Sequence, residues 1–253
     1  MNFFTLDATN YGFFVGALLL SLVVIAVYKD WLLLTPALVV QYLVMAVIAN
    51  DLNNTAARVM LGPVPLAVFL KGMSGVIAGL ILFLTGYAIL FATRGFRREE
   101  AEAEAAGLGG LRRFFYREEA ARLNRFRYVD YLLPLGAVII AVAATYALTT
   151  LLPFSGNFLG DFSFYLLGSV GIAIMVVGRD ILKLGAGLLV SLNGADLLYS
   201  LLRNGDSPLV LGISATITIL LALLISYLAI LYHSKMKTLI ISEGVRRKRK
   251  QVS

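Results

Sequence analysis

The sequence has no cysteine, and His233 is the only histidine among its 253 residues. These absences exclude iron–sulfur clusters, cysteine-based zinc sites and haem held by two histidines as cofactors of the chain alone. Charged residues are also scarce, at 15% of the chain, whereas 59% of it is hydrophobic. A soluble domain normally keeps its apolar share at about half or below. The composition therefore predicts a polytopic membrane protein without a cofactor of its own.

Sequence motifs of catalysis and of secretion are missing as well. We find no Ser/His/Asp arrangement, no glycine-rich loop suited to a phosphate and no residues at metal-ligand spacing. The first apolar run ends in Tyr28-Lys29-Asp30 and not in a small-residue cleavage site, so we expect no cleavable signal peptide. The chain thus lacks a recognisable catalytic site of its own, and an enzymatic role stays open only through partner subunits.

Seven apolar segments are each long enough to cross a bilayer, which takes about 20 residues of α-helix. The third segment is the longest, and we expect it to tilt or to project into the cytoplasm. We therefore predict an all-α integral membrane protein with seven transmembrane helices, at roughly 11–28, 31–49, 64–93, 131–153, 162–178, 181–202 and 208–233.

The chain contains two weak copies of one pattern, 150 residues apart. Lys29-Asp30 and Arg179-Asp180 each stand at a tight turn between two apolar segments. Paired charges inside a membrane would be costly, so these turns predict hairpins in preference to continuous long helices. A Pro-Leu pair opens the third segment of each copy, at Pro65-Leu66 and at Pro208-Leu209. We predict two parallel three-helix repeats joined by one linking helix.

The repeats leave two basic segments outside the predicted helices. Between Leu111 and Tyr128, aromatic and aliphatic residues alternate with six arginines, which is typical of an amphipathic helix on the inner leaflet; a solvated loop is the alternative. The predicted parts are 1–93 for the first repeat, 94–129 for a basic cytoplasmic loop, 130–155 for the linking transmembrane helix, 156–234 for the second repeat and 235–253 for a basic cytoplasmic tail.

The distribution of basic residues predicts the orientation in the membrane. Of the 22 Lys and Arg residues, nine lie in 94–129 and seven follow His233. With Lys29, Arg179 and Lys183, 19 of the 22 fall on one side of the predicted helices. Because basic residues favour the cytoplasmic side, we place the N-terminus outside and the C-terminus in the cytoplasm of a prokaryotic cell, across its inner membrane. The net charge of +7 then indicates anionic lipids as partners and no nucleic acid.

Two ionisable residues within the predicted spans are the first candidates for a functional site, because such residues are expensive in hydrocarbon. Lys71 lies six residues after Pro65, which places it about 9 Å below the outer boundary. Asp196 lies seven residues before Arg203, at a similar depth. The two form either a buried ion pair, linked to proton or sodium movement, or separate local contacts in which Lys71 extends to the headgroups.

Four further polar residues are weaker candidates. Asn193 lies three residues before Asp196 on the same helix face, where it suits a hydrogen bond to a neighbouring helix. Asp180 and Lys183 predict a local pair at the cytoplasmic end, unless Lys183 points into a half-channel. Thr216 belongs to a weak polar stripe on the last helix, which more often reflects bonding within that helix.

These residues resemble a known family. Arg179-Asp180-Ile181-Leu182-Lys183, Asn193-Gly194-Ala195-Asp196 and Asp206-Ser207-Pro208-Leu209 resemble the last two helices of the NuoK/MrpC-type family, the small three-helix subunits of complex I and of Mrp cation/proton antiporters. The seven-helix length and Phe69-Leu70-Lys71 resemble hydrogenase-4 component E, a membrane subunit of group 4 energy-converting hydrogenases. The resemblance covers roughly 175–235 and, more weakly, 25–90.

The resemblance implies a non-redox membrane-arm subunit that lies between antiporter-like pumps and a redox module. Lys71 matches the family's third-helix lysine, Lys183 matches a basic residue and Asn193-Gly194 matches an Asn-Gly pair. The chain departs from the family where relatives carry acids, since it has Leu189, Leu192, Thr216 and Ile219 there. A path for protons would therefore depend on Lys71 and Asp196, or the subunit is mainly structural.

Two other functions stay open from the sequence. A plan of three helices, one linker and three helices is shared with SWEET-type sugar carriers, but these place a proline in each repeat's first helix. The segments 11–28 and 162–178 contain none. A purely structural assembly subunit is the other alternative, and it is favoured if Lys71 and Asp196 do not meet.

Overall fold

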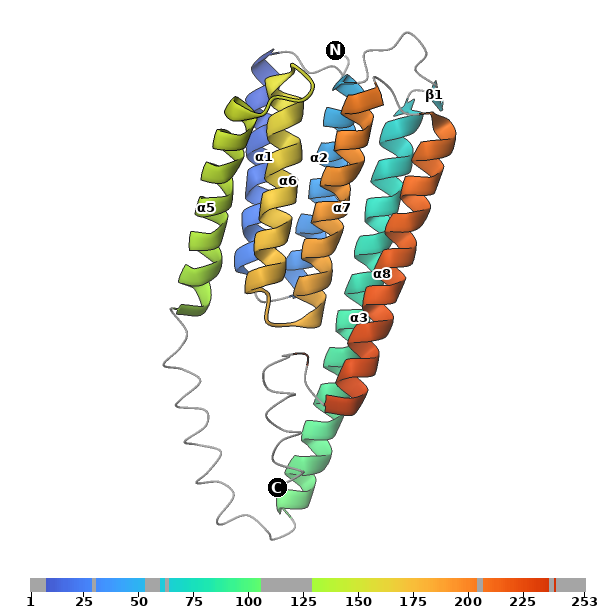
Figure 1. Cartoon of the computed structure of the whole chain (residues 1–253). Helices are drawn as coiled ribbons and strands as arrows, with labels where there is room; N and C mark the ends of the chain where they lie inside the picture. The colour runs from blue at the N-terminus through green and yellow to red at the C-terminus, as the bar shows by residue number, and fades with distance from the viewer. Residues whose placement is uncertain are drawn as a thin grey trace.

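A computed structural model describes residues 8–28, 31–52, 60–61, 64–105, 129–203, 207–236 and 239. Within these residues the chain is α-helical apart from one hairpin of two-residue strands and the connecting turns (Figure 1). The helices are α1 (Ala8–Val27), α2 (Trp31–Leu52), α3 (Leu66–Ala105), α5 (Val129–Leu151), α6 (Phe158–Val177), α7 (Ile181–Arg203) and α8 (Pro208–Met236), and the antiparallel strands are β1 (Met60–Leu61) and β2 (Val64–Pro65).

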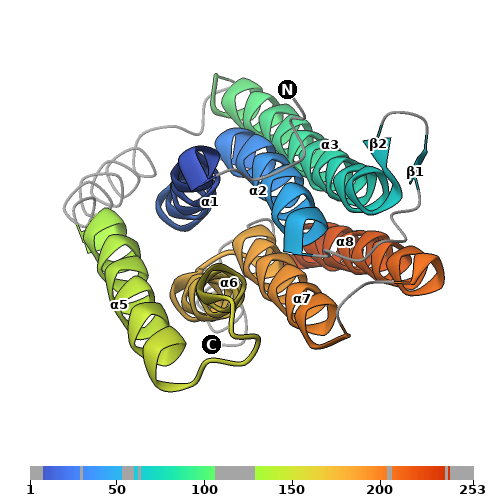
Figure 2. The same ribbon diagram turned by 90° about the horizontal axis from the view of Figure 1, so that it is seen from above.

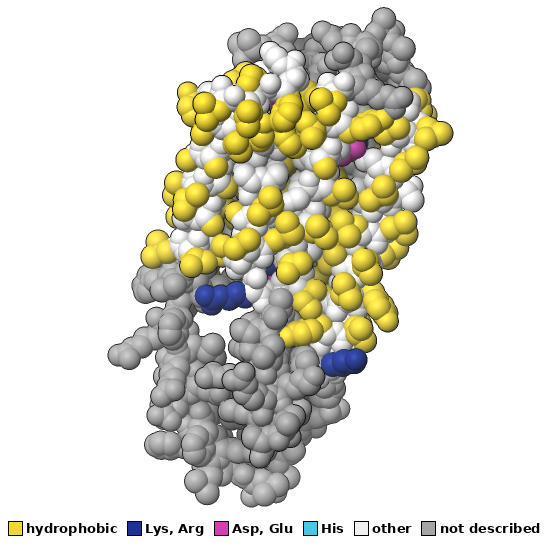
Figure 3. Space-filling model, in the orientation of Figure 1, with side chains coloured by type: hydrophobic (Ala, Val, Ile, Leu, Met, Phe, Trp, Pro, Cys, Tyr) yellow, Lys and Arg dark blue, Asp and Glu magenta, His cyan; other side chains and the backbone are white. Residues whose placement is uncertain are grey.

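Six of the helices are long and apolar enough to cross a membrane, and α1 adds a shorter apolar stretch, Gly12–Val27. Hydrophobic side chains cover the face drawn in Figure 3, and Lys and Arg side chains lie at its lower end. A chain with this many apolar helices is a multi-pass membrane protein. The prediction of an all-α membrane protein is thus confirmed at the level of its apolar helices.

The helices form two rows of three, with α5 outside them (Figure 2). One row contains α1, α2 and α3, and the other contains α6, α7 and α8. Each helix of one row contacts its counterpart in the other: α1 contacts α6, α2 contacts α7 and α3 contacts α8. In Figure 1 both members of each of these pairs run in the same direction, and α5 runs opposite to α6.

Glycine allows the helices within each row to approach closely. A Cβ atom on Gly187 of α7 would lie 2.8 Å from the carbonyl oxygen of Gly171 on α6. A Cβ atom on Gly75 of α3 would overlap the side chain of Tyr42 on α2. Small residues at such contacts are typical of helix pairs in membranes, where close van der Waals packing drives association.

Two helix boundaries differ from the prediction by more than three residues. The helix expected to begin at 162 begins at Phe158, because Asn157 caps it: the Asn157 side chain accepts a hydrogen bond from the Leu159 N–H. Asp161, in the first turn of α6, is only 1% exposed and anchors the preceding loop. Its carboxylate accepts hydrogen bonds from the backbone and hydroxyl of Ser155, at 2.8 Å for the hydroxyl, and from the Phe154 N–H at 2.9 Å.

The third helix extends beyond its predicted end. α3 has 40 residues, of which Leu66–Ala92 is the apolar part, and it continues through the expected boundary at 93 to Ala105. In Figure 1 this end of α3 reaches past the lower ends of α1, α6 and α7. The predicted amphipathic helix at 111–128, the turn Lys29-Asp30 and most of the tail 235–253 lie outside the described residues.

Candidate functional site

Lys71 and Asp196 form an ion pair between α3 and α7. The Lys71 Nζ atom lies 3.0 Å from Asp196 Oδ2, and the two side chains are 6% and 14% exposed. Lys71 also donates a hydrogen bond to the Ser200 hydroxyl at 3.3 Å. Ser200 follows Asp196 by one helical turn, and its hydroxyl donates to the Asp196 carbonyl oxygen at 3.1 Å. Of the two arrangements open from the sequence, the structure therefore has the buried pair.

Both members of the pair lie inside apolar helices. Lys71 belongs to the stretch Leu66–Ala92 and Asp196 to Ile181–Leu202, the candidate membrane spans of α3 and α7. Removing two charges from water is expensive, and only close pairing with additional hydrogen bonds offsets that penalty. Neutralising one partner would leave the other as an uncompensated charge in a low-dielectric environment. The ion pair links α3 to α7, and we expect the removal of only one of its members to be costly.

The ion pair stands at one end of a polar stripe on α7. The Leu189 carbonyl, Asn193, Asp196 and Ser200 follow one another at intervals of four, three and four residues, which places them on one face of the helix. The Tyr42 hydroxyl of α2 donates to the Leu189 carbonyl oxygen at 3.2 Å. Asn193 is buried, and its Nδ2 atom has no partner among the described residues. Over about 16 Å, this face of α7 presents polar groups to the interior.

The neighbouring helices add two buried polar side chains: Gln41, which the sequence did not single out, and Thr218, which belongs to the predicted polar stripe of the last helix. Gln41 on α2 is fully buried, and both of its amide atoms lack partners among the described residues. Thr218 on α8 is 4% exposed and interacts with the Tyr42 hydroxyl. The adjacent polar pair Gln41-Tyr42 within an apolar segment was the available signal in the sequence.

The polar stripe does not continue to the lower end of α7. The five residues between Lys183 and Leu189 are all apolar: Leu184, Gly185, Ala186, Gly187 and Leu188. Ala186 is completely buried, and Ile225 of α8 packs against Gly185. About 9 Å of apolar helix therefore separates the Tyr42 contact from Lys183.

Asp180 and Lys183 stabilise helix ends at the turn between α6 and α7. The Asp180 carboxylate accepts a hydrogen bond from the Lys183 backbone N–H at 2.6 Å, so Asp180 is the N-cap of α7. The Lys183 Nζ atom donates to the Tyr28 carbonyl oxygen at 3.3 Å, at the end of α1. A cation at that position complements the negative end of the helix dipole. The expected local contact of Asp180 with Lys183 is thus present through the Lys183 N–H and its charge, and the ammonium group in addition caps α1.

Burial of this turn affects the acidity of Asp180. Desolvation raises the pKa of the Asp180 carboxyl above its usual value, and the hydrogen bond and charge of Lys183 act in the opposite direction.

Thr216 does not belong to the polar cluster. Its side chain is exposed on the outside of α8, and its hydroxyl donates to the Gly212 carbonyl oxygen of the same helix at 2.8 Å. Thr218 points inward instead, since two residues turn a helix by about 200°. The prediction of bonding within the helix is confirmed for Thr216, and its candidacy for an ion path stays a prediction.

Fold and site together define a class: a multi-pass α-helical membrane protein with a buried ion pair between two of its helices. Searches of family models, curated proteins and solved structures found no match to the chain. The part of the chain that the structure describes contains no group of three or more His, Cys, Asp or Glu residues placed to hold a metal ion.

Proposed function

We propose that the protein is a non-redox membrane-arm subunit of a complex that couples electron transfer to proton or sodium translocation, of the complex I or group 4 hydrogenase kind. The Lys71–Asp196 ion pair is the observation that carries this proposal. Ionisable residues within membrane spans are rare and mark ion pathways or relays by default. In this proposal the chain has no active site of its own, and antiporter-like membrane subunits are its partners.

The arrangement of the helices supports the proposed topology. The two rows have equivalent helices running in equal directions, which fits two parallel three-helix repeats with α5 as the linking helix. Arg179, Lys183 and Lys235 lie at the same end of the bundle as the beginning of α5 and the end of α8, which adjoin the basic loop and the basic tail in the sequence. We place this end in the cytoplasm and the N-terminus outside, across the inner membrane of a prokaryotic cell.

The ion pair acts in this proposal as a switchable contact. In its closed state, Lys71 and Asp196 neutralise one another between α3 and α7. A charge that arrives in a neighbouring subunit changes the balance between the closed pair and an open one, because electrostatic forces are strong in a low-dielectric interior. The polar stripe ends at the Leu189 carbonyl, so the pair is proposed to act laterally, toward a partner subunit, and not through a complete channel within α7.

A charge-removal series in the native complex tests this proposal. A tagged chain is purified from its own membranes, its partners are identified by mass spectrometry, and ion translocation per electron is measured in vesicles. The variants are Lys71→Met, Asp196→Leu and the double change. Ser74→Ala is the matched control, because Ser74 lies one turn from Lys71 and its hydroxyl donates only to the Lys71 carbonyl in the known contacts.

The double variant separates an ion-coupling subunit from a structural one. Replacing a buried ion pair by apolar residues is often neutral for stability. A coupling subunit would therefore assemble normally in the double variant but lose translocation. A structural subunit, which the apolar stretch of α7 favours, would keep both. A purified chain that transports a solute alone in liposomes, without partners, would instead establish the carrier alternative.

A further inference from the structure

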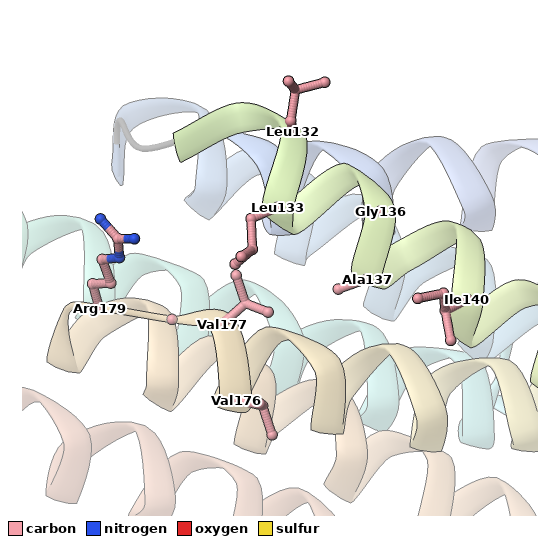
Figure 4. A pocket seen from close by; sticks show the side chains of 9 residues that line it. Leu132, Leu133, Gly136, Ala137, Ile140, Val176, Val177 and Arg179 are labelled. Carbon is pink, nitrogen blue, oxygen red and sulfur yellow. The ribbon is translucent and has the colours of Figure 1, made fainter. Parts of the chain in front are cut away.

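An apolar groove lies between the beginning of α5 and the end of α6 (Figure 4). It has a volume of about 530 Å³, and it is lined on one side by Leu133, Gly136 and Ile140 and on the other by Val176 and Val177. Ile140 and Val176 are 71% and 79% exposed, so the groove opens outward from the bundle. In a membrane-spanning protein this opening faces lipid.

Hydrogen bonds explain why the groove occurs at this end of α5. The other half of α5 is held against α6, where the Thr145 and Ser169 hydroxyls lie 2.8 Å apart and Ser169 also donates to the Ala141 carbonyl. The Tyr165 hydroxyl donates to the Leu152 carbonyl just beyond α5. On the groove side α5 has Gly136, whose Cβ position would meet nothing within 4 Å. The groove is thus built into the helix pair and does not depend on a neighbouring molecule.

Positive charge stands at the lower end of the groove. Arg179 lines it and follows α6 by two residues, which is where the apolar span of α6 ends. Figure 4 shows the Arg179 guanidinium group beyond Leu133 and Val177, past the apolar walls. An apolar slot with Arg179 at the membrane boundary complements a lipid with an acyl chain and an anionic headgroup.

The length of the groove suits an acyl chain of one leaflet. From Leu133 to Ile140 the groove runs for about 10 Å of helix, most of the roughly 15 Å depth of one leaflet's hydrocarbon.

We infer that this groove binds one anionic phospholipid, with an acyl chain along Gly136 and Ile140 and its phosphate at Arg179. The inference depends on the chain spanning a membrane and not on ion translocation, so the two proposals fail separately. An annular lipid at this place would also fill the wedge beside α5 and hold the linking helix at its present angle to α6.

Native mass spectrometry of the full-length chain tests the inference, with phosphatidylglycerol and phosphatidylethanolamine of identical chains as the probes. We expect one phosphatidylglycerol to be retained preferentially. Arg179→Gln should lower that preference about fivefold, as expected for one basic residue at a membrane surface. Lys235→Gln is the matched control, because it removes an equal charge from the end of α8, and it should leave the preference unchanged.

Substitutions that fill the groove test whether an acyl chain occupies it. Gly136→Leu should reduce retention of both lipids, whereas Gly212→Leu should not, although a Cβ at either glycine would meet nothing within 4 Å. A photoreactive residue at the exposed position 140 should cross-link to lipid. Equal effects of Arg179→Gln and Lys235→Gln would overturn the headgroup assignment. Unchanged retention in Gly136→Leu, or a protein cross-link at position 140, would overturn the groove assignment.

Discussion

Two combinations of one acid and one base lie beside α7: Lys71 of α3 with Asp196, and Asp180 with Lys183. The charged groups of the two combinations bind different partners. Deep in the span, the two side chains bind each other across α3 and α7. At the end of the span, Asp180 caps α7 and Lys183 caps α1, so both interact with backbone groups. Near the boundary, helix ends and water can satisfy a charge, whereas inside the bundle only an opposite charge and a few hydroxyls are available.

The largest effect should come from breaking the deep pair. Lys71→Met leaves the Asp196 carboxylate without its partner, and we expect a loss of about 3 kcal/mol in unfolding free energy. Chemical unfolding in detergent, followed by circular dichroism, measures the change. Adding Asp196→Leu should recover most of the loss. A single variant as stable as the unmodified chain would contradict the burial of an ionised pair.

The boundary lysine should matter less. Lys183→Met removes the cation from the end of α1 and its charge from the neighbourhood of Asp180, but the Lys183 N–H still donates to Asp180, so we expect a loss of about 1 kcal/mol. Lys183→Arg, which keeps the charge, is the control and should retain most of the stability. A loss as large as that of Lys71→Met would remove the distinction between the two sites.

The Asp180 cap gives a similar but separable effect. Asp180→Ala removes the acceptor for the Lys183 N–H at the start of α7, and the expected loss is about 1 kcal/mol. Asp180→Asn keeps an acceptor oxygen and should restore stability. If Asn behaves like Ala in the same unfolding measurement, the carboxylate acts through its charge and not as a cap.

The smallest effect is expected on α8. Thr216→Val changes an exposed hydroxyl that bonds only within its own helix in the known contacts, so stability should change by less than about 0.5 kcal/mol. Thr218→Val removes a buried hydroxyl next to Tyr42 and should cost more. Equal changes in unfolding free energy for the two variants would contradict the assignment of Thr216 to the outer face of α8 and of Thr218 to its inner face.

The sequence was sufficient for the helices and for the depth of the two ionisable residues, but it left open whether they pair. Long apolar runs determine the spans, and counting residues from Pro65 and Arg203 placed Lys71 and Asp196 at a similar depth. The rotation of each helix about its axis could not be predicted, because helices that are apolar all round have no face that must turn inward. The contact of Tyr42 with the Leu189 carbonyl depends on that rotation.

The ends of helices were harder to predict for a different reason. A carboxylate within an apolar run suggests a boundary, but Asp161 lies inside α6 because a loop folds back to supply its hydrogen bonds. Lys183 likewise reaches a carbonyl on α1, 155 residues away in sequence. The tertiary fold determines these hydrogen-bond partners, and no local sequence pattern predicts them.

The most direct test of the proposed role is ion translocation per electron in the assembled complex with both Lys71→Met and Asp196→Leu. The proposal predicts a stable complex whose electron transfer persists while its ion translocation is lost. Full translocation in that complex would show that the pair takes no part in ion translocation.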